Sequence, residues 1–279
     1  HVKNVLLIGT DKEKGGSARS DSIMIASVNK QTGKITVVSI LRDTHLDIPG
    51  ECEAKVNSAY AWGGANLLVK TIEENFGIKI DDYATVNFEM FTELVDGLGG
   101  IEVEVTENEA DYINNRHNYK GEEKPEYVES GESVHLTGYQ ALWYSRIRKL
   151  DSDFNRTERQ RKVISAIVED VKGKMNPVGV FELISTAKSV APFIETTLST
   201  TDFWGLVTSL LICFTKSGAD MDKLLVSAQL PFEDSWWFSS EWDGSSISID
   251  LDENREKLYE LLYEVPAEDS STEEASEEF

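Results

Sequence analysis

Short apolar runs separated by turn residues open the chain. The run VKNVLLIGT at residues 2–10 ends beside a glycine and predicts a buried strand. Two further strands are expected at 22–29 (SIMIASVN) and 34–41 (KITVVSIL). The intervening NKQTGK supplies a turn at Gly33, so the pattern predicts that these two strands form a hairpin.

Helical and extended patterns then alternate. The segment 64–77 has helical spacing, with Gly77 placed to end the helix. A strand is expected at 83–88, and a helix at 89–100 that is stopped by its glycines. The alternating IEVEV of 101–105 is typical of a half-exposed or edge strand.

The second half of the chain is mainly helical. Helical spacing returns near residue 137 and continues to about 216, followed by two strand patterns at 223–232 and 245–251 and an amphipathic helix at 253–264. Strands interleaved with helices indicate one α/β or α+β domain with a mixed sheet flanked by helices.

The domain is expected to span residues 1–263. Within it, residues 105–133 are polar and lack a clear apolar pattern, which predicts a variable excursion. The tail 264–279 has seven acidic residues and no basic one, so we expect it to be disordered and solvated.

Charge narrows the classes of function. A formal charge of −23 over 279 residues argues against general binding to nucleic acid and against docking on anionic lipid through charge alone. The most apolar stretch, 203–214, is too short for a membrane span. Because the chain begins at His1, we expect a processed or trimmed form, in which any upstream signal or anchor would not be visible. Cys52 and Cys213 are either two free thiols or one disulfide.

Positive charge concentrates in one segment of this acidic chain. The stretch YSRIRKLDSDFNRTERQRK at 144–162 holds seven basic residues and three acidic ones. Asn155 and Glu158 have capping-box spacing, which predicts a helix beginning at Arg156. Its apolar stripe continues back through Gln160 to Arg156, so both side chains are expected to face the interior. The same periodicity places Arg159 at the edge of the stripe, and Arg161 and Lys162 on the outer face.

A buried arginine requires an anion, so Arg156 and Gln160 are expected to line an anion pocket or to satisfy an internal carboxylate. Arg146 and Arg148 would join them if their segment is extended. The competing interpretation is a solvated basic helix with ion pairs to Asp151 and Asp153.

Acidic and basic residues also follow the strands of the amino-terminal half. Asp11 follows the first strand, Arg19 and Asp21 begin the second, and Arg42 and Asp43 end the third. Such strand ends meet at one edge of a sheet, where α/β folds bind ligands. Asp11 and Asp21 are candidate magnesium ligands, because Mg²⁺ binds one or two carboxylates together with phosphate oxygens. The glycines of GTDKEKGGS lack P-loop spacing, and no pattern indicates a catalytic triad.

Six segments together resemble the LytR-CpsA-Psr family. They are NVLLIGTD, RSDSIMIASVNKQTGKITVVSILRDT, KVNSAYAWGG, VNFEMFTELVDGLGGIEVEV, HLTGYQALWYSRIR and DSDFNRTERQRKVISAI, and they cover most of residues 4–170. The resemblance implies a mixed sheet with an apolar tunnel for a polyprenyl tail. The helices within 160–215 would either line this tunnel or simply pack in the core. It also implies an extracytoplasmic enzyme, anchored by an N-terminal transmembrane helix, that transfers a glycopolymer from a polyprenyl-pyrophosphate carrier to peptidoglycan.

The resemblance also implies roles for single residues. Asp11 and Asp21 are similar to magnesium ligands, with manganese as the alternative ion. Asp43 is expected to orient Arg42 or to act as a base. The residues similar to the pyrophosphate-binding set are Arg42, Arg146, Arg148, Arg156 and Gln160, with Arg19 as a further member.

Three alternative functions stay open from the sequence. A hydrolase of the same lipid pyrophosphate would use the same site, and a non-catalytic lipid-pyrophosphate binder would retain its ligand without turnover. A DNA-binding regulator is disfavoured by the −23 charge and by the lack of a helix-turn-helix pattern.

Overall fold

A six-stranded mixed sheet forms the centre of the computed structural model, which describes residues 2–10, 20–115, 127–147, 153–191, 194–218, 220–239 and 246–263. The strand order is β10-β3-β2-β1-β6-β9. β10 is parallel to β3 and β1 is parallel to β6, whereas the other neighbours are antiparallel. The strands are β1 (Val2–Thr10), β2 (Ser20–Asn29), β3 (Lys34–Ile40), β6 (Asp82–Val86), β9 (Glu195–Thr196) and β10 (Leu225–Leu230).

Three two-stranded ribbons accompany this sheet. They are β4 (His45–Asp47) with β5 (Glu53–Lys55), β7 (Ile101–Val105) with β8 (Gly131–Leu136), and β11 (Trp236–Phe238) with β12 (Ile247–Ile249). The alternating exposure of β7 confirms the half-exposed strand that its sequence pattern predicts.

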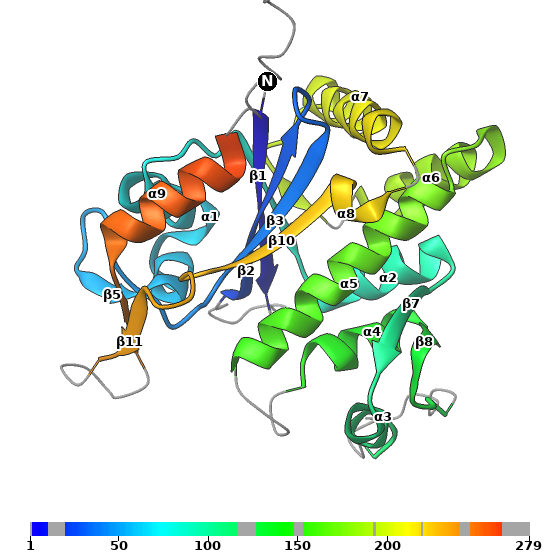
Figure 1. Ribbon diagram of the computed structural model, residues 1–279, viewed down its shortest axis with the longest axis horizontal. Helices are drawn as coiled ribbons and strands as arrows, with labels where there is room; N and C mark the ends of the chain where they lie inside the picture. Colours follow the sequence, from blue (N-terminus) through cyan, green and yellow to red (C-terminus); the bar gives the residue numbers. More distant parts are fainter. Residues whose placement is uncertain are drawn as a thin grey trace, which may run out of the picture.

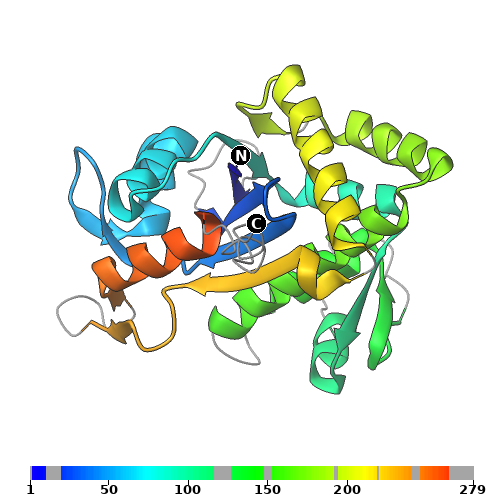
Figure 2. The same ribbon diagram turned by 45° about the horizontal axis from the view of Figure 1, so that its top comes forward.

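Helices cover both faces of the sheet. Their bounds are α1 (Val56–Phe76), α2 (Phe88–Leu98), α3 (Glu107–Asn114), α4 (Gly138–Ser145), α5 (Asp153–Gly173), α6 (Pro177–Val190), α7 (Thr200–Ser217), α8 (Met221–Leu224) and α9 (Leu251–Tyr263). Figures 1 and 2 show α1 and α9 on one side of the sheet and α5, α6 and α7 on the other. This arrangement confirms the predicted mixed sheet flanked by helices.

The apolar side chains that β1 and β2 direct to one face of the sheet form part of the hydrophobic core. Leu6 and Ile8 pair with Ile25 and Ile23, so their side chains share one face of the sheet, and all four are buried against α1 and α9. A second buried cluster joins the β7–β8 ribbon to α4 and α5, and a third joins β2 and β3 to α7 and α8. The described residues therefore form three hydrophobic clusters around one sheet.

Two glycines determine where helix α1 is interrupted and where it ends. Gly77 ends α1 with a φ of 67°, a left-handed conformation that glycine adopts without strain, as the sequence predicts. Gly64 has a φ of 66° and breaks α1 near its middle, so the helix predicted at 64–77 is the part after the break, and α1 begins earlier, at Val56.

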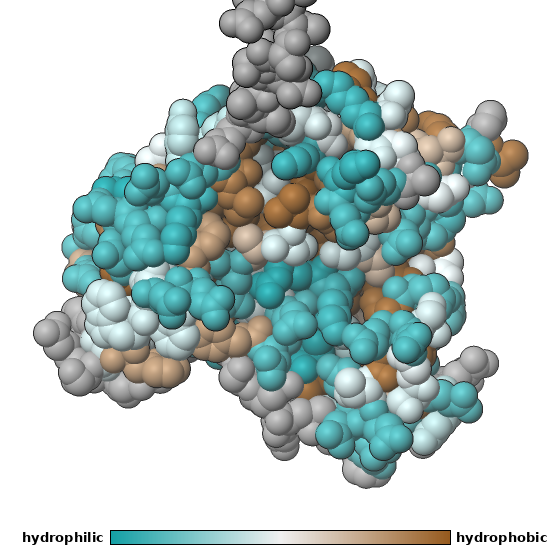
Figure 3. Space-filling view, viewed as in Figure 1, coloured by the Kyte–Doolittle hydropathy of each residue, from teal (hydrophilic) through white to brown (hydrophobic). Residues whose placement is uncertain are grey.

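A groove of about 360 Å³ lies beside α9. Its walls include Phe232, Leu261 and Leu262 together with polar residues of β2 and β3. Figure 3 shows a hollow with hydrophobic side chains at this part of the surface. Both cysteines are free thiols: Cys52 is exposed, whereas Cys213 lies on the side of α7 that is buried against β2 and β3.

Candidate active site at the arginine-rich edge of the sheet

Three strand ends meet at one edge of the sheet, as expected. β1 ends where β2 begins, since Thr10 lies opposite Ser20, and β3 ends beside them, since Ile40 lies opposite Ile23. Residues distant in sequence are therefore neighbours at this edge.

Asp21 and Arg42 form the centre of this edge. Arg42 Nη1 lies 2.7 Å from Asp21 Oδ1, and both side chains are partly exposed. This charge-assisted hydrogen bond fixes the Arg42 guanidinium at the sheet edge. It thereby also fixes the direction of the remaining N–H donors of Arg42. The structure thus brings Asp21 and Arg42 together at one edge of the sheet, where the sequence places them.

Asp43 holds the same arginine from the other side. Its Oδ2 lies 3.5 Å from Arg42 Nε, and its Oδ1 lies 3.3 Å from Lys55 Nζ. Lys55 comes to this position because it pairs with His45, the first residue of β4, two residues after Asp43. These contacts favour an orienting role for Asp43. Lys55 was missed from sequence, because no motif spacing distinguishes it from other lysines before the strands are paired.

Arg156 reaches the edge from α5. Its side chain is only 3 % exposed, and its Nη2 lies 3.4 Å from the main-chain oxygen of Asp21. Gln160 is half-buried one turn further along α5, with Nε2 at 3.5 Å from the main-chain oxygen of Ser145. Both residues face inward, as the helical periodicity predicts. A solvated basic helix, the competing interpretation, is wrong for this side of α5.

Arg146 borders the site next to Ser145, at the end of α4. The centre of its guanidinium lies 4.0 Å from the centroid of the Phe88 ring and 4.9 Å from that of Trp143. These cation–π contacts hold the guanidinium plane in place. Phe88 and Trp143 were not expected as supports from the sequence, since their contact with Arg146 depends on how α2 and α4 pack.

We call this group of residues the arginine edge, and it comprises Asp21, Arg42, Asp43, Arg146, Arg156 and Gln160. Three further residues predicted for the site, Asp11, Arg19 and Arg148, lie outside the described residues.

The binding of magnesium by Asp11 and Asp21 stays a prediction, because Asp11 lies outside the described residues. The described residues contain no group of three or more histidine, cysteine, aspartate or glutamate side chains that could hold a metal ion. The Asp21 carboxylate nevertheless offers the hard oxygen donor that Mg²⁺ prefers, beside cations suited to phosphate, so the donor chemistry fits this ion.

Two expectations about α5 are wrong. The helix begins at Asp153 rather than Arg156, which places Asn155 inside the first turn. Several polar residues that suit a helix start precede Arg156, so the capping-box spacing alone did not fix the boundary. Arg161 is also not on an outer face, because it is half-buried and donates to Gln229 Oε1 of β10 at 3.4 Å.

Arg159, which the periodicity places at the edge of the apolar stripe, is buried with 4% of its surface exposed. Its side chain pairs with Glu109 Oε1 of α3 at 3.2 Å and donates to the Ile147 carbonyl at 2.9 Å. The reason is that α5 lies between the central sheet and the β7–β8 ribbon, with α3 at the end of that ribbon (Figure 1). Part of the predicted excursion 105–133 therefore forms ordered structure that holds α5.

The Arg159–Glu109 pair predicts a stability effect. We expect Arg159→Met to lower the free energy of unfolding by about 3–5 kcal/mol, because it leaves the Glu109 carboxylate without this partner in a low-dielectric setting. The matched control is Lys162→Met, which removes an exposed pair with Glu104 on the same helix and should cost no more than about 1 kcal/mol. Urea unfolding measures both changes, and equal losses would contradict a buried ion pair.

The chain matches the LytR_cpsA_psr family over residues 1–249, and it belongs to this family. Two curated relatives carry the name polyisoprenyl-teichoic acid–peptidoglycan teichoic acid transferase TagU. The protein of Bacillus mycoides (strain KBAB4) is 38% identical over 170 residues, and that of Enterococcus faecalis (strain ATCC 700802 / V583) is 40% identical over 192 residues. These matches cover 60% and 67% of this chain but only 51% and 59% of the two relatives.

Solved structures share the whole fold. Bacillus subtilis TagV superposes with a TM-score of 0.72 and 25% identity, covering 95% of this chain and 98% of TagV. TagT with bound octaprenyl pyrophosphate lipid superposes with a TM-score of 0.68 and 26% identity, covering 94% of this chain and 90% of TagT.

None of the described helices combines the length and the apolar character that crossing a membrane requires.

Proposed function

We propose that this chain is a magnesium-dependent phosphotransferase of the cell envelope. It would move a glycopolymer such as teichoic acid from a polyprenyl-pyrophosphate carrier to a sugar hydroxyl of peptidoglycan, on the extracytoplasmic face of the membrane. The observation that carries the proposal is the buried Arg156 beside the Arg42–Asp21 pair, at the sheet edge where α/β folds bind ligands. The names of the TagU relatives and the lipid bound to TagT support the choice of substrate.

The arginine edge suits a pyrophosphate. It combines Arg42, Arg146 and Arg156 with the amide of Gln160, and an arginine fork matches phosphate oxygens in geometry as well as charge. Phosphoryl transfer requires positioning and neutralisation of developing charge more than a covalent nucleophile. Prepositioned guanidinium groups would supply both, because Asp21, Asp43 and the Phe88 ring already hold them.

In the proposed reaction, an oxygen of the acceptor sugar hydroxyl attacks the phosphorus that carries the glycopolymer. The bond from that phosphorus to the bridging oxygen breaks, and polyprenyl phosphate leaves with the bonding pair. The hydroxyl proton passes to solvent or to a carboxylate of the edge. Asp11 and Asp21 would hold Mg²⁺, which neutralises phosphate charge when bound.

The polyprenyl tail needs an apolar path away from this edge. We place it between the sheet and the helices α5 and α7, where Val168, Val171 and Leu210 are partly buried beside the core of β2 and β3.

The proposal is tested by incubating the purified chain with a lipid-pyrophosphate glycan, with and without a peptidoglycan fragment. Mass spectrometry should find polyprenyl phosphate and a phosphodiester-linked acceptor, both dependent on magnesium. Formation of free glycan phosphate at the same rate with and without acceptor would identify a hydrolase instead. Retained lipid without any turnover would identify a binding protein.

A further inference from the structure

Helix α7 presents apolar side chains to solvent as well as to the core. Cys213 and Phe214 are buried towards the sheet, yet Phe203, Trp204 and Leu211 are 38%, 49% and 42% exposed. The sequence between Asp202 and Lys216 contains no charged residue. A surface helix of a globular protein normally carries charged residues on its outer face, so the exposed side of α7 is unusual.

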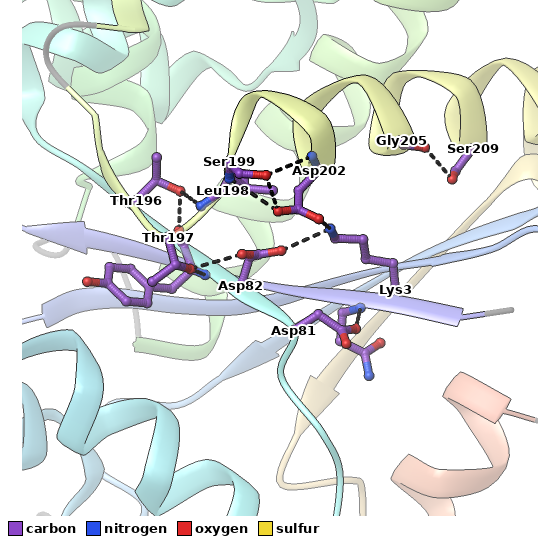
Figure 4. A network of polar contacts seen from close by, with 12 residues as sticks. Lys3, Asp81, Asp82, Thr196, Thr197, Leu198, Ser199, Asp202, Gly205 and Ser209 are labelled. Carbon is purple, nitrogen blue, oxygen red and sulfur yellow. Dashed lines mark hydrogen bonds and ion pairs between the residues drawn. The ribbon is translucent and has the colours of Figure 1, made fainter.

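The amino-terminal end of α7 is fastened to the sheet. Lys3 Nζ lies 2.9 Å from Asp82 Oδ2 of β6 and 3.4 Å from Asp202 Oδ1 of α7, while Ser199 caps the helix by accepting from the Asp202 amide (Figure 4). Burial lowers the pKa of Lys3, but the two carboxylates outweigh burial and raise it above its usual value. The position of α7 is therefore fixed by interactions with the sheet.

The carboxyl-terminal end of α7 lies against a basic turn. Lys216 Nζ donates to the main-chain oxygens of Lys30 at 3.0 Å and Gln31 at 2.8 Å, in the turn between β2 and β3. The side chains of Lys30, Lys34 and Lys216 are all exposed. Three lysines thus gather beside an uncharged helix face on a chain whose net charge is −23.

This basic turn lies at the opposite end of the sheet from the arginine edge. Val2 pairs with Asn29 beside the turn, whereas Thr10 pairs with Ser20 at the arginine edge. At about 3.3 Å per residue, the length of β1 separates the two ends by roughly 27 Å.

We propose that the exposed side of α7 docks on an anionic lipid bilayer, with Lys30, Lys34 and Lys216 at the headgroups and the arginine edge directed away from the membrane. Phe203, Trp204 and Leu211 would enter the boundary between headgroups and acyl chains, where aromatic side chains are favoured. The charge of the lysines complements anionic headgroups. A symmetric second copy on the same face would instead place two sets of lysines close to each other, which disfavours a dimer.

The apolar contribution is tested by sedimentation of the full chain with vesicles of phosphatidylcholine and phosphatidylglycerol. Trp204→Asp should lower the partition coefficient about tenfold, because an aromatic side chain no longer leaves water. Trp62→Asp is the matched control, since Trp62 has the same exposure of 49% on α1, and it should bind like the wild type. Leu211→Asp provides a second variant if Trp204→Asp unfolds at a lower temperature.

The basic contribution is tested with Lys30→Glu/Lys34→Glu. This variant should lose at least about tenfold in binding to the anionic vesicles and change little on pure phosphatidylcholine. Lys70→Glu, at an exposed lysine of α1, is the control and should bind like the wild type.

The proposal is overturned if wild-type chain stays in the supernatant, or if the Trp204 and Trp62 variants partition alike. It is also overturned if Trp204→Asp dissociates a dimer in analytical ultracentrifugation, since α7 would then be an interface between copies. The assay contains no lipid pyrophosphate, so failure of bilayer docking and failure of the proposed transferase activity are distinguishable.

Discussion

Arg156→Ala is expected to lower turnover of a polyprenyl-pyrophosphate substrate about 10²–10³-fold, the usual effect of removing one oriented donor from a transition-state site. Arg156 is the most buried cation of the arginine edge, and its guanidinium is positioned by the Asp21 main chain. In this setting a donor stabilises developing phosphate charge more strongly than it would in water. Single-turnover kinetics of polyprenyl phosphate release measure the change.

Two variants control this prediction. Arg156→Lys keeps the charge but loses the planar fork, so it should recover only part of the lost rate. Arg161→Ala removes an arginine of the same helix that contacts Gln229 instead of the edge, and its rate should stay close to the wild-type rate. Similar losses in the Arg156 and Arg161 alanine variants would show that α5 acts through stability rather than through phosphate contact.

Asp21→Ala is expected to remove most of the magnesium-dependent rate, a loss of at least about 10²-fold. Two contributions lead to this loss, since the Asp21 carboxylate would hold the ion and also positions Arg42 at 2.7 Å. Measuring rate against magnesium concentration separates them. Asp21→Asn should raise the half-saturating concentration of magnesium, because an amide replaces a charged ligand.

Arg42→Ala is the matched control for the orienting contribution. It should lower the rate while the half-saturating magnesium concentration changes little. If Asp21→Asn and Arg42→Ala show the same magnesium dependence as the wild type, Asp21 only orients the arginine, and the metal assignment is wrong.

The strand ends that form the site could be predicted from the sequence. Apolar runs at 2–10, 22–29 and 34–41 predict three buried strands, and a hairpin between the last two requires that Asp21 and Arg42 lie at one edge. The inward position of Arg156 could also be predicted, because the apolar stripe of α5 continues back through Gln160 to Arg156. These predictions succeed because strand and helix periodicity are local properties.

The remaining features depend on packing between distant segments. Lys55 reaches Asp43 only after β4 and β5 pair, and the Phe88 ring meets Arg146 only after α2 packs on α4. Periodicity places Arg161 on the solvent side because it identifies only one apolar stripe, whereas α5 is covered by the sheet on one side and by the β7–β8 ribbon on another. Tertiary contacts of this kind have no signal in a single sequence.

Equilibrium binding of a short polyprenyl pyrophosphate tests the central claim most directly, because it requires neither an acceptor nor turnover. Isothermal titration calorimetry should show that Arg42→Ala/Arg156→Ala binds at least about 10²-fold more weakly than the wild type, since each charge-assisted contact contributes about 1.5–3 kcal/mol. Arg161→Ala should bind like the wild type. Equal affinity of the double variant and the wild type would contradict the account, and the arginine edge would then be a structural ion-pair network rather than a pyrophosphate site.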